Sequence, residues 1–426
     1  MGDCRMPLRG KDHKVIIEKL LGGFVADVSQ YSMGFRSYSS IDEPFMYVDV
    51  TISDQNKVIQ EIMAGDPSDY SIVIGHRAAN DQSIAGRFHV ASVLTATQTA
   101  PKKAQGITFR CKGQEHLLNE QTKFAESEFW WQGAPTTKIV KRILDWTMKI
   151  TPKGFANSND TSEVAIPRQH PIQVIGWLNS IAKSPTGVHG NYAFYQKFSG
   201  GKAEYYYDDV PFLLLAGPKW IFKENETNMS KTAAGCRVID EIYVNGANES
   251  PILSKMATGF QNASTATQQG FGRRSFIEQK YIRKEARAKR KEPNDLTFIG
   301  GPPMTEVQKY IKEVFQQDTQ GRVLYEPLCD DTTLRPKQME WHEAWIEGRS
   351  LPARILSKMV EIKSYATPDI GPGDIVTLQV PEYIASPGRG LDPSQGGDYF
   401  VYAVEHLCDR NGEMTSNLLL SKDGTT

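Results

Sequence analysis

Two short groups of residues have types and spacing that could support catalysis. His342-Glu343 begins like the zinc-binding motif of metalloproteases, but Ile346 stands where that motif needs its second histidine. His406 and Cys408 lie two positions apart, so on a strand they would share a face and could act as base and nucleophile. A cysteine at a strand end is more often a small core residue. We therefore expect a solvated helix face for the first group and a structural role for the second.

The remaining candidate motifs also lack the pattern that a chemical site needs. Asp208-Asp209 and Asp330-Asp331 lie beside turns, but neither pair has the ligand spacing of a calcium loop. No dinucleotide-binding, phosphate-binding or nucleophile-elbow motif occurs in the sequence. The five cysteines form no CxxC pair, which disfavours a zinc site and a disulfide framework and favours assembly in a reducing cytoplasm. The sequence thus predicts no catalytic, cofactor-binding or metal-binding residues, no cofactor, and a protein that is not an enzyme.

The segment from Arg273 to Glu292 is strongly basic, whereas the whole chain carries a net charge of −1. Arg283, Arg287 and Arg290 recur at helical spacing and could form a stripe that faces phosphates. The alternatives are an exposed helix that glutamates interleave, or a contact with an acidic protein surface. We favour these alternatives, because no aromatic residues that could stack on bases are interleaved regularly with the arginines.

Composition and hydropathy point to an ordinary globular protein. Hydrophobic residues make up 39% of the chain, and 35 glycines with 23 prolines indicate many turns. No apolar run approaches the roughly 18 residues of a membrane span, and no secretory signal peptide is evident. Two aromatic clusters, Trp130-Trp131 and Tyr205 to Tyr207, hint at carbohydrate or receptor binding, but such clusters are more often core or subunit interface.

The C-terminal part of the chain predicts the closing strands of a β-barrel. Asp374 to Val380 alternates, with Val376, Leu378 and Val380 on one face, and the glycines of Ile370 to Gly373 favour a turn before it. Tyr399 to Val404, an Asn-Gly turn and Met414 to Leu420 predict a hairpin.

An earlier segment resembles this one. In Gly86 to Val93 and Gly397 to Val404 a glycine, an aromatic residue and two valines occupy matching positions, at an offset of 311 residues. We therefore expect two similar barrels in which Val90 corresponds to Val401 and Val93 to Val404.

The rest of the chain predicts a β-rich α+β protein. Alternation indicates strands at 24–28, 45–52, 71–74, 88–94, 107–111, 191–195, 203–207 and 238–244. Helical spacing indicates helices at 56–63, 135–150, 171–182, 305–315 and 337–345, and a short amphipathic piece at 15–21 after a polar arm. We expect an N-terminal arm and first antiparallel β-barrel domain at 1–118, an α/β accessory domain at 119–234, a second barrel domain at 235–264 and 351–426, and a helical, basic insertion domain at 265–350.

Two stretches resemble a known family. Tyr47 to Met63 with Tyr70 to Ile74 is similar to the first tube domain of phage baseplate hubs, and Ile370 to Val380 with Tyr399 to His406 is similar to the close of the second. The family is the central baseplate hub of contractile-tailed (myovirus) phages, of the T-even type with two tube domains, which is related to the hub part of type VI secretion spike proteins. The resemblance covers most of the chain by element order. The basic segment 273–292 and the loop 381–397 have no counterpart in it.

The resemblance implies a virion protein of the phage tail baseplate, assembled in the host cytoplasm. Three chains with two tube-type barrels each would form a pseudo-hexameric ring, which can dock a sixfold tail tube protein on one face and a threefold central spike protein on the other. Neighbouring baseplate proteins would be further partners, and DNA would pass through the lumen without specific binding. The resemblance implies no catalytic residues.

Two rival functions stay open at this point. A tail-associated cell-wall hydrolase would need a paired acid and base or a metal site. A receptor- or carbohydrate-binding tail protein would use exposed aromatic residues such as those of the two clusters.

Overall fold

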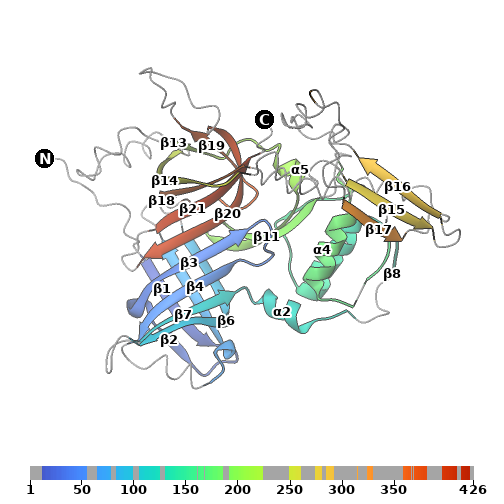
Figure 1. Ribbon diagram of the computed structural model, residues 1–426. Helices are drawn as coiled ribbons and strands as arrows, with labels where there is room; N and C mark the ends of the chain where they lie inside the picture. Colours follow the sequence, from blue (N-terminus) through green and yellow to red (C-terminus); the bar gives the residue numbers. More distant parts are fainter. Residues whose placement is uncertain are drawn as a thin grey trace, which may run out of the picture.

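The computed structural model describes residues 12–54, 65–77, 83–98, 105–124, 130–160, 162–166, 168–185, 191–223, 249–260, 274–280, 285–291, 314, 324–329, 358–365, 367, 369–380, 396–409 and 414–422. The described residues are β-rich: they form a large sixteen-stranded mixed sheet, a two-stranded sheet and a three-stranded sheet, with a few helices on one side of the large sheet (Figure 1). The large sheet does not close on itself as a whole, because β2 at one end of the strand order pairs only with β1 among the described strands.

The N-terminal strand group forms one half of the large sheet. Its strands are β1 (Asp12–Lys19), β2 (Val25–Asp27), β3 (Ser32–Ser40), β4 (Tyr47–Asp54), β5 (Tyr70–Arg77), β6 (Ser83–Gln98) and β7 (Gln105–Lys112). They pair in the order β3-β4-β7-β6-β5-β1-β2, and two short 3-10 turns, Ser29–Tyr31 and Pro67–Asp69, lie between them. Alternate residues such as Val48, Val50 and Ile52 are buried in one core, as the period of two predicts.

Two strands of this group differ from the expectation. Within the segment that we predicted as a polar arm and an amphipathic piece, the structure describes β1, in which Val15 and Ile17 are buried at a spacing of two, while residues 1–11 lie outside the described residues. Its full pairing with β5 explains why a strand forms there. The strand β3 had no sequence signal, because Ser37, Ser39 and Ser40 are polar although they are buried.

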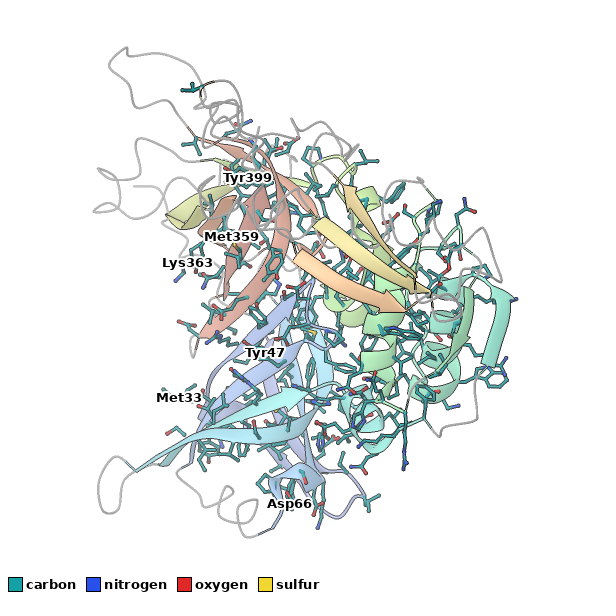
Figure 2. The ribbon with its side chains drawn as sticks, turned by 45° about the vertical axis from the view of Figure 1, so that its right-hand side comes forward. Met33, Tyr47, Asp66, Met359, Lys363 and Tyr399 are labelled. Atoms are coloured by element: carbon teal, nitrogen blue, oxygen red, sulfur yellow. The ribbon has the colours of Figure 1, made fainter. Side chains whose placement is uncertain are left out.

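The C-terminal strand group forms another large part of the same sheet. It contains β13 (Trp220–Lys223), β14 (Glu249–Phe260), β18 (Lys358–Tyr365), β19 (Ile375–Gln379), β20 (Gly397–Asp409) and β21 (Met414–Lys422). The strands pair in the order β14-β18-β21-β20-β19-β13, and β13 also pairs in parallel with β14. Although β13 lies within the sequence range expected for the accessory domain, its pairings are with this group. Figure 2 shows Tyr47 on the N-terminal group and Met359 and Tyr399 on the C-terminal group above it.

The two groups repeat the same strand order and much of the same register, although β6 shifts a second time, between Val93 and Thr95, where β20 does not. The run β3-β4-β7-β6 corresponds to β14-β18-β21-β20, and all of its pairings are antiparallel. Val90 lies opposite Cys111 in the first group, and Val401 lies opposite Leu420 in the second. In both ladders the register shifts at the next residue, Ala91 or Tyr402, which is the geometry of a β-bulge.

The flanking ladders extend this correspondence. On one side, Val48 opposite Cys111 matches Val360 opposite Leu420. On the other side, Ile72 opposite Phe88 matches Val376 opposite Tyr399, and all four of these side chains are buried. β6 and β20, the two segments that the 311-residue offset relates, therefore hold equivalent positions in their groups.

The middle of the chain forms a smaller α/β part that joins the large sheet through the pairing of Lys202 with Ala85. Its strands are β8 (Trp130–Ala134), β9 (Gly154–Phe155), β10 (Ser162–Ala165), β11 (Tyr192–Ser199) and β12 (Lys202–Asp209); its helices are α2 (Glu115–Gln121), α3 (Thr136–Arg142), the π-helical turn Ile143–Met148, α4 (Pro171–Ile181) and α5 (Val210–Leu213). The predicted helix after Pro171 and the predicted hairpin β11–β12 are both present. A separate hydrophobic core lies under α3 and α4.

The basic segment is not a helix. β15 (Arg274–Lys280) and β16 (Glu285–Lys291) form an antiparallel hairpin, and β17 (Leu324–Cys329) pairs with β15 in parallel. Arg287 and Arg290 are three residues apart on β16, a spacing that aligns side chains on a helix but places them on opposite faces of a strand, so these two do not form the phosphate-facing stripe, an interpretation that we did not favour. Arg283 itself, His342-Glu343, Asp330-Asp331, the strand 238–244, the helices 56–63 and 337–345, the helix 305–315 apart from Val314, and the loop 381–395 lie outside the described residues.

Candidate functional site

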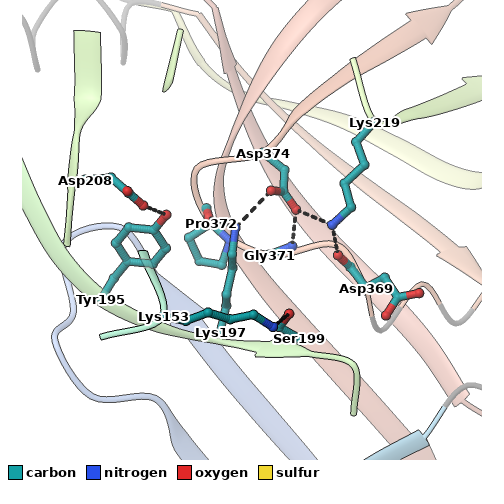
Figure 3. Close-up of polar contacts among 10 residues, drawn as sticks. All are labelled: Lys153, Tyr195, Lys197, Ser199, Asp208, Lys219, Asp369, Gly371, Pro372 and Asp374. Carbon is teal, nitrogen blue, oxygen red and sulfur yellow. Dashed lines mark hydrogen bonds and ion pairs between the residues drawn. The ribbon is translucent and has the colours of Figure 1, made fainter. Parts of the chain in front are cut away.

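A buried ion pair joins the middle part of the chain to the C-terminal strand group. Lys197 on β11 reaches the turn before β19, where its Nζ lies 2.9 Å from Oδ1 of Asp374. The turn has the predicted glycine chemistry, since Gly373 adopts a φ of +86°. The backbone N–H of Gly371 donates to Oδ2 of Asp374 at 2.9 Å, which fixes the carboxylate within the turn (Figure 3).

Burial distinguishes the two lysines that contact this carboxylate. The side chains of Lys197 and Asp374 are only 11% and 13% exposed, and Lys197 also donates to the carbonyl oxygen of Pro372 at 3.2 Å. Lys219 approaches Oδ2 of Asp374 at 3.2 Å from the solvent side, with 41% of its side chain exposed, and also donates to the carbonyl of Asp369. The Lys197–Asp374 pair is thus the inner of the two contacts.

The acidic pair Asp208-Asp209 has structural partners. Tyr195 donates its hydroxyl to Oδ2 of Asp208 at 2.7 Å, and Ser184 donates to Asp209. Burial raises the pKa of Asp208, although the hydrogen bond from Tyr195 and the nearby Lys197 oppose the rise. Both carboxyl groups therefore hold the hairpin β11–β12 in place, which is a role that the sequence did not indicate.

His406 and Cys408 also lie in the interior. The imidazole of His406 is 2% exposed, its Nδ1 lies 2.9 Å from Oγ of Ser416, and burial lowers its pKa to about 4. Burial raises the pKa of the Cys408 thiol to about 12. A neutral thiol in the core is a poor nucleophile, so the structural role expected for this pair agrees with its surroundings.

The aromatic cluster at Tyr205 to Tyr207 is largely core. Tyr205 and Tyr207 are buried and donate their hydroxyls to Glu115 at 2.9 Å and to Asn179 at 2.7 Å. They offer no exposed face for a sugar. By contrast, Trp146 is 64% exposed beside an apolar hollow, and the guanidinium of Arg142 lies 4.0 Å from its ring centroid. The lining of the hollow is Phe124, Ile139, Arg142, Ile143, Trp146, Thr147 and Ile166.

The two strand groups are joined by an antiparallel ladder between β20 and β3. The ladder runs from Ala403 opposite Ser40 to Asp409 opposite Gly34, and Arg36 and Glu405 form an ion pair across it. Gly34 has a φ of +121°, and a Cβ added there would overlap the backbone carbonyl oxygen of Cys408. Backbone contact, rather than a pocket, is the main feature of this joint.

Among the described residues, no group of three or more His, Cys, Asp or Glu side chains could hold a metal ion. Likewise, no described helix is long and apolar enough to cross a membrane.

No family model matches the sequence, and no curated protein matches it. Solved structures do resemble it. With 12% sequence identity and a TM-score of 0.55, the chain is similar to the tail protein from Neisseria meningitidis MC58 over 97% of each chain. With 9% identity and a TM-score of 0.54, it is similar to the 43 kDa tail protein of prophage MuSo2 from Shewanella oneidensis, over 97% of this chain and 100% of that one. At such identities the likeness shows a shared fold.

Proposed function

We propose that this protein is a structural component of a phage-type tail, the central baseplate hub of a contractile tail. Three chains form a ring that adapts the sixfold tail tube to the threefold central spike and lets DNA pass. The fold that it shares with two tail proteins supports the tail assignment. The partners are the tube protein, the spike protein and neighbouring baseplate proteins, and the place of action is the virion.

The observation that carries this proposal is the register-matched repeat. Two strand groups with the same order, the same bulge at Ala91 and Tyr402, and equivalent core residues give one chain two similar units. Three such chains present six similar units around one axis, which is what an adaptor between sixfold and threefold partners needs. We retain two tube-type barrels as part of the proposal; the cyclic pairing of β13, β14, β18, β21, β20 and β19 supports the second of them.

The domain division belongs to the same proposal: a first tube domain at 1–118, an accessory domain at 119–234, a second tube domain at 235–264 and 351–426, and an insertion at 265–350. The buried Lys197–Asp374 pair supports a fixed attachment of the accessory part to the second unit. That rigidity suits a ring component that carries force along a tail.

The test is the molar mass of the purified chain by light scattering, together with negative-stain images. A trimer of about three chain masses with six similar lobes around a central hole is expected. A stable monomer that hydrolyses cell wall would overturn the hub and favour the rival hydrolase. The rival receptor-binding role has one structural feature in its favour, the exposed Trp146; loss of host binding on Trp146→Ala with an intact virion would support it.

A further inference from the structure

The strands β1 and β13 hold the same place in their strand groups although they run in opposite directions. Ile72 on β5 and Val376 on β19 are equivalent by the matched ladders, and they lie opposite Ile17 on β1 and Trp220 on β13. β1 is antiparallel to β5, whereas β13 is parallel to β19. The C-terminal end of β1 and the N-terminal end of β13 therefore lie at the same end of their groups.

The segments that adjoin these two ends contact equivalent turns. Leu20, the residue after β1, donates its backbone N–H to the carbonyl oxygen of Asp69 at 2.8 Å. Leu213, the last residue of α5, lies beside Gly373, where an added Cβ would be 3.1 Å from its Cδ1. Asp69 and Gly373 each stand three residues before the equivalent residues of β5 and β19. A hairpin turn in one group and a short helix in the other thus occupy the same position of the repeated unit.

Both segments expose large apolar side chains. At the hairpin turn between β1 and β2, Leu21 is 99% exposed and Val25 is 70% exposed. On α5 and just after it, Phe212 is 64% exposed and Leu215 is 58% exposed. Only Trp146 is comparable among the large hydrophobic side chains that the structure describes. Apolar exposure in the described part of the chain is therefore concentrated at these two equivalent positions.

Local contacts hold these side chains outward. In the first segment, the backbone N–H of Lys19 donates to the carbonyl oxygen of Phe24 at 3.0 Å, and the Phe24 ring packs edge-on against Tyr70. In the second segment, the backbone N–H of Leu215 donates to the carbonyl oxygen of Phe212 at 3.1 Å, and the half-buried leucines between them pack against a hydrophobic core. Apolar side chains that a fixed backbone presents to water at two equivalent positions indicate a surface that binds a partner.

We propose that the hairpin site (Leu21 and Val25) and the helical site (Phe212 and Leu215) bind the same apolar pocket on successive subunits of the tail tube protein. Three chains carry three sites of each kind, which alternate around the ring at six equivalent positions. A partner that meets all six positions with one kind of pocket repeats six times, and the tube is the sixfold partner of the proposed hub. Two side chains per position form a weak contact alone, but six contacts made together bind by avidity. The inference rests on the proposed function and specifies the surface that holds the tube.

A charge placed at each site tests the proposal, with the tail tube protein of the same phage as the probe. Leu21→Asp and Phe212→Asp should leave the molar mass of the ring and the thermal midpoint of the chain unchanged, because both side chains are exposed. Each variant removes three of the six contacts, so each should weaken tube binding, measured by sedimentation, at least about tenfold and by a similar factor. Leu118→Asp, at a 39% exposed leucine of α2, is the matched control and should bind the tube protein as the unaltered ring does.

Photocrosslinking in purified, assembled tails identifies what each site touches. Benzoylphenylalanine in place of Leu21 and, in a second variant, in place of Phe212 should crosslink to the same peptide of the tube protein, because one kind of pocket receives both sites. The same group in place of Leu118 should give no tube crosslink. Crosslinks from the two sites to different peptides, to another baseplate protein, or between copies of this chain would overturn the proposal.

The outcomes separate the two proposals. A ring that binds the tube protein equally well with either aspartate and with the control substitution overturns the apolar contact and leaves the hub intact. An effect of only one of the two aspartates overturns the sixfold assignment, since it points to a threefold partner. A chain that is monomeric at every concentration, or a ring to which the tube protein does not bind, overturns both proposals. If an aspartate variant misfolds, the crosslinks decide.

Discussion

Ala91 and Tyr402 hold equivalent positions in two related strands, 311 residues apart in the sequence. Each is the extra residue at a register shift, and each directly follows a buried valine. A bulge bends its strand and increases the local twist. In β20 the strand changes its second partner at this point, from β19 to β3. In β6 the strand leaves β5 at the equivalent point, and beyond it β7 is its only partner among the described strands. The bulge in β20 thus marks where that strand leaves its own group to contact the other one.

The joint between the two groups should not tolerate a side chain at Gly34. Gly34→Ala would bring Cβ against the backbone carbonyl of Cys408, in addition to the strain of positive φ, and should cost at least about 3 kcal/mol of unfolding free energy. Gly22→Ala is the matched control, because Gly22 has a φ of +84° but nothing within 4 Å of the added Cβ. It should cost only about 1 kcal/mol. Urea unfolding of both variants measures the difference, and similar losses would show that the close approach at Gly34 is unimportant.

The two lysines around Asp374 should differ in what they contribute. Lys197→Met removes the inner, largely buried partner and should reduce stability by about 2 kcal/mol, because part of a desolvated carboxylate loses its charge partner. Lys219→Met removes an exposed partner of the same carboxylate and should cost less than about 1 kcal/mol. Chemical denaturation compares them. A larger loss for Lys219→Met would mean that the outer contact dominates.

His406 should make the protein less stable in acid. Burial lowers its pKa to about 4, so the unfolded chain binds the proton at a higher pH than the folded one does. The stabilising contribution is therefore complete above pH 6.5 and is lost as the pH falls towards 4, by about 3 kcal/mol in total. His406→Gln keeps a polar partner for Ser416 but cannot titrate, so its unfolding free energy should fall less over this range. His89 and His116 titrate in both proteins and cancel in the comparison. Parallel pH profiles would contradict the assignment.

The inside and outside of β19 should respond differently to a carboxylate. Val376 is fully buried in the C-terminal core, so Val376→Asp should cost about 4 kcal/mol by burying an unpaired charge. The hydroxyl of Thr377 donates to Asp398 at 2.6 Å near the surface, so Thr377→Asp loses one hydrogen bond and adds a like charge, for about 1 kcal/mol. Thermal melts of the two variants decide the matter. Equal losses would show that this face lies against another subunit or that the assignment is inverted.

The basic hairpin should lie on the outer side of the ring. A channel wall that bound phosphate tightly would stall DNA, so we predict that the segment 273–292 faces a neighbouring baseplate protein. Arg283→Glu, Arg287→Glu and Arg290→Glu together should weaken baseplate assembly while the isolated ring keeps its mass. As a control, replacing the exposed Lys138, Lys141 and Lys149 together with glutamate gives the same change in net charge, and this variant should assemble normally. Arginines that line the channel in an assembled trimer would contradict this placement.

The sequence by itself determined the elements whose stability depends on near neighbours. The period of two in Val376, Leu378 and Val380 places these residues in the core, and the glycines of the turn before them have the expected function. Proline at the first turn and an apolar stripe were sufficient to predict α4. The offset between two short valine-rich segments also located two strands that hold equivalent positions.

Only the tertiary structure decided the features that rest on contacts between distant segments. Ser37 and Ser39 are buried because β20, more than 360 positions away, supplies the backbone partners of their strand. The basic segment forms a β-hairpin because its two strands pair with each other, whereas the spacing of its arginines alone suggests a helix. Lys197 and Asp374 are remote in sequence, and nothing in either local pattern specifies the other. Sheet pairing and buried ion pairs depend on which segments meet in space, and a local pattern of residues does not contain that information.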